Sequence, residues 1–134
     1  MDMRPILMAA AAMAALLPVT ATAAAPKGVW TNPRKTVRVV FQPCGDAICG
    51  KVVAATPQAE ADARRGGGAP LVGAMLFQDF RQNETGLWNG SVLVPDLGQT
   101  ITGTIRQVDA NTLVGEGCVF ANIGCRTQTW TRVK

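Results

Sequence analysis

Histidine and tyrosine are both absent from the 134-residue sequence. Without histidine, the chain lacks the commonest acid–base catalyst and the commonest metal ligand in proteins. Most catalytic triads and zinc-peptidase sites are therefore excluded. The carboxylates of Asp79, Glu84 and Asp96 could form an acid–base pair, but nothing in their spacing brings them together. We expect no enzyme, no cofactor and no metal site.

Charged residues are also few, and they are scattered along the chain. They make up 16% of the sequence, with a formal net charge of +4. The basic residues do not interleave with aromatic residues as in a nucleic-acid-binding surface, so we expect no nucleic-acid partner. Arg64 and Arg65 precede three glycines and could hold an anion, but the Lys-Ser/Thr of a phosphate-binding loop is missing.

The N-terminal residues have the pattern of a secretory signal peptide. Arg4 precedes an apolar run over residues 6–17, and Ala21-Thr22-Ala23 fits a cleavage site. The run is shorter than the about 20 residues that a membrane-spanning helix needs. We expect a signal peptide over residues 1–23, no permanent membrane span, and a periplasmic or secreted protein.

The four cysteines are expected to form disulfides, because an even number in a small exported chain is typical of an oxidising compartment. Spacing alone leaves three pairings open. We favour the local pairs Cys44 with Cys49 and Cys118 with Cys125, since each could close a tight turn between strands. The Cys-x6-Cys spacing of the second pair does not suit a four-cysteine zinc site.

Period-two alternation of apolar residues dominates the rest of the chain, and it predicts strands. Residues 36–42 and 48–55 are expected to form a hairpin. Further strands are expected at residues 71–80, 86–95, 99–108, 112–119 and 126–133, the first of these buried on both faces. In residues 99–108, Ile101, Gly103 and Ile105 share one face.

Residues 56–70 are polar and glycine-rich, and we interpret them as a surface loop with at most a short helical turn. No linker divides residues 24–134. The sequence therefore predicts one all-β domain, an antiparallel up-and-down barrel of seven or eight strands. In a closed meander the first and last strands become neighbours, so that no sheet edge remains.

Gly28 and Trp30 near the start, with an arginine near the end, resemble the pattern of the lipocalin-like, or calycin, barrels. In those barrels the arginine lies across the indole and closes one end. The resemblance implies that Arg132, or else Arg126, pairs with Trp30 here, with Trp130 beside them.

A more extensive resemblance covers nearly all of the chain after the signal peptide. Gly-x-Trp, Cys-Gly-x-x-x-Cys-Gly, Pro-Leu-x-Gly, Asp-x-Gly-x-Thr and Gln-Thr-Trp-Thr-Arg follow one another in this order. The set is similar to an exported bacterial family known as a domain of unknown function. The family often has tyrosines beside the Asp-x-Gly turn, which this chain lacks. The resemblance implies a small calycin-like barrel and transfers no catalytic residue.

The resulting functional hypothesis is non-catalytic binding of a small, largely apolar ligand in the barrel mouth. Trp88, Phe80 and Arg65 are the candidate ligand-binding residues. The alternative is an envelope module with a self-filled barrel whose outer surface binds a protein partner. An eight-stranded barrel is just wide enough to fill itself or to hold one ligand.

Overall fold

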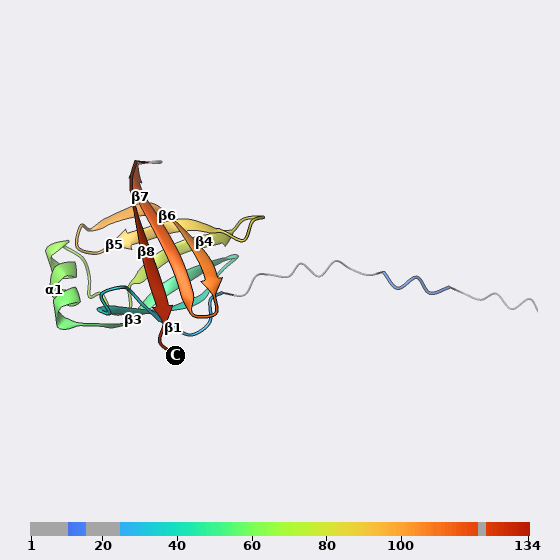
Figure 1. Cartoon of the computed structure of the whole chain (residues 1–134), viewed down its shortest axis with the longest axis horizontal. Coiled ribbons are helices and arrows are strands. Elements are labelled where there is room, and N and C mark those ends of the chain that lie inside the picture. The colour runs from blue at the N-terminus through green and yellow to red at the C-terminus, as the bar shows by residue number, and fades with distance from the viewer. Residues whose placement is uncertain (1–10, 16–24, 121–122) are drawn as a thin grey trace, which may run out of the picture.

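The computed structural model describes residues 11–15, 25–120 and 123–134 (Figure 1). The predicted signal peptide lies outside these residues except for residues 11–15. No helix among the described residues is long and apolar enough to span a membrane. In chain order the elements are β1 (Val29–Thr31), β2 (Val37–Cys44), β3 (Ala47–Ala55), α1 (Pro57–Arg65), β4 (Met75–Gln82), β5 (Trp88–Val94), β6 (Gln99–Asp109), β7 (Thr112–Phe120) and β8 (Ile123–Arg132).

The eight strands form a closed antiparallel barrel in which each strand pairs with the next one in the chain. The prediction of an all-β up-and-down barrel is confirmed. Its closure is short, because β1 has only three residues and pairs with β8 only at Trp30 with Arg132 and Thr31 with Thr131. Residues 123–129 of β8 therefore pair with β7 alone, and the expectation that closure leaves no sheet edge is wrong for this segment.

Alternation places one side of each strand in the barrel interior. On β6, Gly103 and Ile105 are buried and Ile101 is half-buried, whereas the residues after Ile105 are exposed. Trp88 lies opposite Ile105 across β5 and β6, and both are buried. The core is continuous and includes residues from β1 to β8.

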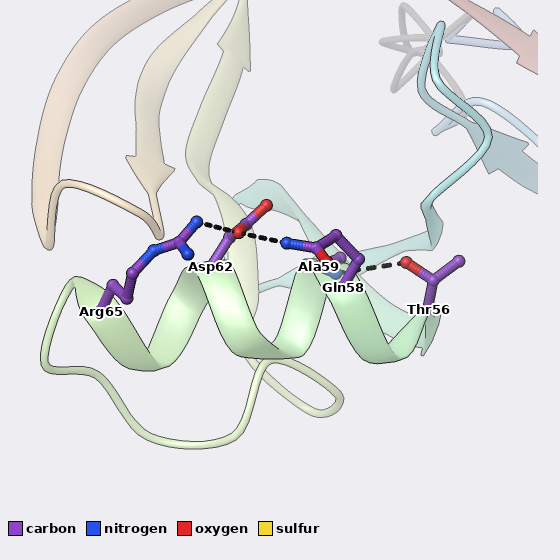
Figure 2. A network of polar contacts seen from close by, with 5 residues as sticks. All are labelled: Thr56, Gln58, Ala59, Asp62 and Arg65. Atoms are coloured by element: carbon purple, nitrogen blue, oxygen red, sulfur yellow. Dashed lines mark hydrogen bonds and ion pairs between the residues drawn. The ribbon is translucent and has the colours of Figure 1, made fainter.

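The segment expected to be a loop contains the nine-residue helix α1 (Figure 2). The Thr56 hydroxyl accepts a hydrogen bond from the Ala59 amide, and Pro57 occupies the first helical turn, which suits its fixed φ and missing N–H. The helix buries Ala63, and its end at Gly66 lies against the backbone of the β5–β6 turn. These capping residues outweigh the glycine-rich composition that suggested a loop.

Strand β4 begins at Met75, four residues later than predicted, and successive residues are both buried only at Leu76 and Phe77, whereas Asp79, Arg81 and Gln82 are exposed. Leu71 is buried in the preceding turn instead. The β4–β5 pairing shifts between Gln78 and Arg81, and Asp79 there has a φ of 53°. This bulge bends the strand and turns Asp79 out to solvent.

Candidate functional site

The centre of the barrel is occupied by aromatic rings. The ring of Phe77 lies 5.4 Å from Phe41, 5.9 Å from Phe80 and 5.3 Å from Trp130 between centroids. The latter two contacts are edge-to-face, a favourable arrangement of ring quadrupoles. The rings come from β2, β4 and β8, so they meet inside the barrel.

Glycines on three strands make room for these rings. A β-carbon at Gly50 would lie 2.5 Å from the Phe77 ring, and one at Gly90 would lie 2.7 Å from the Phe80 ring. One at Gly103 would lie 2.6 Å from Val92. The interior is therefore shaped by glycines that each lie against a larger side chain, as in a packed core.

The three candidate ligand-binding residues do not form one site. Phe80 is fully buried in the aromatic core, and Trp88 is 6% exposed at the start of β5. Arg65 lies in the last turn of α1, where it is exposed and pairs with Asp62 (Figure 2). Because β5 begins at the end of the barrel opposite the α1 end, Trp88 and Arg65 lie at opposite ends.

Two hollows lie at the end of the barrel where β1 starts and β8 finishes. The first has a volume of about 670 Å³, and its lining includes Leu87, Trp88 and Arg106. The second, of about 220 Å³, is lined partly by Lys27 and Arg132. Sequence reasoning singled out only Trp88 for ligand binding, because the register of the β5–β6 hairpin, which places Ile105 opposite Trp88, is needed to bring Arg106 beside the β4–β5 turn.

The residues expected to close the barrel lie together at this same end. Trp30 is opposite Arg132 in the β1–β8 pairing, and it is fully buried. A β-carbon at Gly28, whose φ is 99°, would lie 2.7 Å from Arg132 Nε, so the glycine permits close approach of the arginine. Trp130 is buried on β8 and donates a hydrogen bond to Gln128.

The structure contains the two local disulfides, Cys44–Cys49 and Cys118–Cys125. The second joins residues directly opposite each other on β7 and β8. The Glu116 carboxylate lies near these two sulfur atoms. Among the described residues, these three side chains are the one cluster of three or more potential metal-ligating residues. Because both cysteines are oxidised, they offer no thiolate to a metal ion.

A small closed antiparallel barrel, filled by its own side chains and covered at one end by a short helix, defines the class of protein. A family model described as "Uncharacterized protein conserved in bacteria (DUF2147)" matches residues 28–132. The chain therefore belongs to this bacterial family, as the order of its motifs indicated. No curated protein and no solved structure matches the chain.

Proposed function

We propose that this protein is a non-catalytic interaction module of the bacterial cell envelope whose outer surface binds a protein partner. The observation that supports this proposal best is the aromatic interior: Phe77 contacts Phe41, Phe80 and Trp130 at the barrel centre. A ligand could enter that space only if these rings moved apart, which would break a well-packed core. The two disulfides suit an oxidising, exported location.

A second candidate function keeps the binding of a small molecule but moves it to the barrel rim. The hollow beside Leu87 and Trp88 has a volume within the range of ligand pockets, about 300–1,000 Å³. Its wall combines these apolar residues with Arg106 and with polar residues, namely Gln82, Thr85 and Gln107. Such a site suits a small molecule with an apolar body and an anionic group.

Native mass spectrometry of the protein, isolated from its host's envelope with and without cross-linking in intact cells, distinguishes the two functions. The interaction module predicts the mass of the processed chain without a small molecule, and a protein adduct after cross-linking. A bound small molecule of constant mass that is lost in Arg106→Ala would favour the rim site instead. Finding neither a ligand nor a protein adduct would contradict both proposals.

A further inference from the structure

One segment of the barrel wall has an unpaired sheet edge. Strand β8 pairs with β7 from Phe120 opposite Ile123 to Thr112 opposite Thr131, but β1 lies beside its last two residues only. Figure 1 shows β8 running from beside the end of β7 towards the C-terminus, with the short β1 near its lower end. All side chains of residues 123–129 are exposed, so no described element covers this edge.

The backbone groups that point to this edge follow from the closure hydrogen bonds. The Val133 amide donates to Val29 of β1, whereas the Arg132 amide donates to Asn111 on the β7 side. Because successive residues of a strand point their backbone groups to opposite sides, Cys125, Thr127 and Thr129 point theirs away from β7. On the N-terminal side of Thr131, these backbone donors and acceptors of β8 have no strand to pair with among the described residues.

The edge has few of the features by which proteins block strand addition. Residues 123–129 contain no proline and no lysine, and their pairing with β7 shows no bulge from Cys118 to Thr112. Short edge strands, prolines, charges and bulges normally prevent edge pairing. The Cys118–Cys125 disulfide holds the hairpin together, so the edge is preorganised for a partner strand.

On the sheet face of Arg126, the charges at the edge are complementary to an acidic partner, whereas Glu116 of β7, which accepts a hydrogen bond from Thr127, lies on the other face. Strand β8 has no acidic residue, and exposed Arg126 lies in the middle of the unpaired segment. Exposed Arg34 and Lys35 lie in the turn that follows β1, where that strand leaves β8. A second copy would bring the same cationic strand and another net charge of +4 to this edge, which disfavours pairing of the chain with itself.

The hairpin end adds an apolar contact. Phe120 and Ile123 lie opposite each other and are each 72% exposed, and Val119 is 53% exposed. Since Ile123 shares a sheet face with Cys125 and Thr127, an apolar residue on the added strand would cover it. The other sheet face presents Arg126.

From these observations we infer that β8 residues 123–129 bind an extended segment of a partner protein as an added antiparallel strand. The segment has acidic side chains on the Arg126 face and apolar or β-branched side chains on the Ile123 and Thr127 face. Main-chain hydrogen bonds supply affinity and alternate side chains supply specificity. This inference rests on the proposed interaction function and names the chemistry of its partner.

Strand addition is tested with the oxidised protein and a synthetic peptide of alternating valine and glutamate, followed by amide NMR. The peptide should slow hydrogen exchange at Cys125, Thr127 and Thr129 by about tenfold or more. N-methylation of the valines should abolish binding, because their N–H groups face β8 in an antiparallel pair. N-methylation of the glutamates should be tolerated. Equal effects of the two modifications, or no binding, would overturn the inference.

Thr127→Pro provides the matching test on the protein, since proline is tolerated at an edge whose N–H faces outward. Affinity for the peptide should fall about tenfold or more, whereas Thr127→Val, which keeps the N–H, should retain it. Thermal unfolding of both variants checks that they are folded. If Thr127→Pro does not fold, the two methylated peptides still decide the result on the unchanged protein.

A photo-cross-linking residue in living cells separates this inference from the proposed function. The residue is placed at Thr127 or, as a control, at exposed Val53 on β3. A partner adduct from Thr127 that is outcompeted by the valine–glutamate peptide supports edge binding. An adduct from Val53 alone leaves the proposed function intact but overturns the edge inference. A concentration-dependent dimer that is lost in Thr127→Pro would overturn it in favour of a second copy.

Discussion

At the scale of single residues, three glycines and the larger side chains beside them determine how the barrel is filled. Gly50, Gly90 and Gly103 leave the space that Phe77, Phe80 and Val92 occupy. Glycine normally weakens a strand because it loses backbone entropy and has no side chain to pack. Here the absent side chain is replaced by a neighbouring one, so each glycine contributes to the core through the residue that covers it.

Gly90→Ala should lower the free energy of unfolding by about 1–3 kcal/mol. Its methyl group would lie 2.7 Å from both the Phe80 ring and the Gln78 carbonyl oxygen, so a buried ring or the backbone must shift. Urea unfolding provides the measurement. Gly115→Ala on β7 is the matched control: its nearest contacts would be 3.8 Å and 3.9 Å, so we expect a change within about 1 kcal/mol. Equal losses in the two variants would contradict the packing argument.

Which residues face inward could be predicted from the sequence only where strands are regular. The alternation on β6 predicted the common face of Ile101, Gly103 and Ile105. It could not predict that Phe77 and Phe80 both enter the core, because residues three apart point to opposite faces of a regular strand. The bulge at Asp79 supplies the extra residue that brings both rings inside.

At the scale of elements, helix α1 is attached to the loop that follows it by one carboxylate. Glu60 accepts hydrogen bonds from the amides of Leu71 and Val72. These two bonds, and then the nearby Arg64, favour the charged form, so the pKa of Glu60 is lowered despite partial desolvation. The buried side chain of Leu71 is thereby held beneath the helix.

The attachment of α1 should depend on pH. Because folding lowers the pKa of Glu60, the stabilisation that its carboxylate gives to the α1 attachment is fully present above the ordinary glutamate pKa of about 4.3. It should be lost as the pH falls through the lowered pKa. Hydrogen exchange at Leu71 and Val72 should then accelerate relative to that at Trp88. In Glu60→Gln, exchange at these two amides should be faster at neutral pH and should not accelerate further relative to Trp88 as the pH falls. If that acceleration persists in the variant, a group other than Glu60 causes it.

The Cys118–Cys125 disulfide stabilises the β7–β8 hairpin more than it stabilises the rest of the barrel. Its outer part lacks a neighbour along β8, so the Cys118–Cys125 bond compensates for the missing pairing. Replacing both cysteines with serine should lower the free energy of unfolding by about 2–3 kcal/mol. Amides between residues 114 and 128 should exchange faster than those of β2 and β3. Serine at both Cys44 and Cys49 is the control, and a uniform loss of protection in the first variant would contradict this local role.

At the scale of the whole molecule, the sequence predicted one all-β barrel, its closure by the first and last strands, and both disulfides. These features follow from local alternation, turn residues and short connections. The length of the closure could not be predicted, because it depends on where β1 turns at Thr31. There the Asn32 side chain accepts hydrogen bonds from the amides of Thr36 and Val37 and folds the chain back. The second rim hollow and the open edge both depend on such non-local geometry.

The short closure makes the last four residues decisive for the whole barrel. Thr131 and Arg132 pair with β1, and the Val29 amide and carbonyl bond to Lys134 and Val133. Ending the chain at Trp130 removes all of these contacts. At about 1 kcal/mol for each hydrogen bond, the loss should be about 3–5 kcal/mol, a large share of a small domain's stability.

Tryptophan fluorescence and calorimetry test this prediction, because Trp30 is fully buried behind the closure. The shortened chain should show red-shifted emission and a lower unfolding temperature. A Val133→Ala and Lys134→Ala double variant keeps the backbone contacts and should unfold close to the unchanged chain. If the shortened chain unfolds at the same temperature as this control, the two ends do not hold the barrel closed.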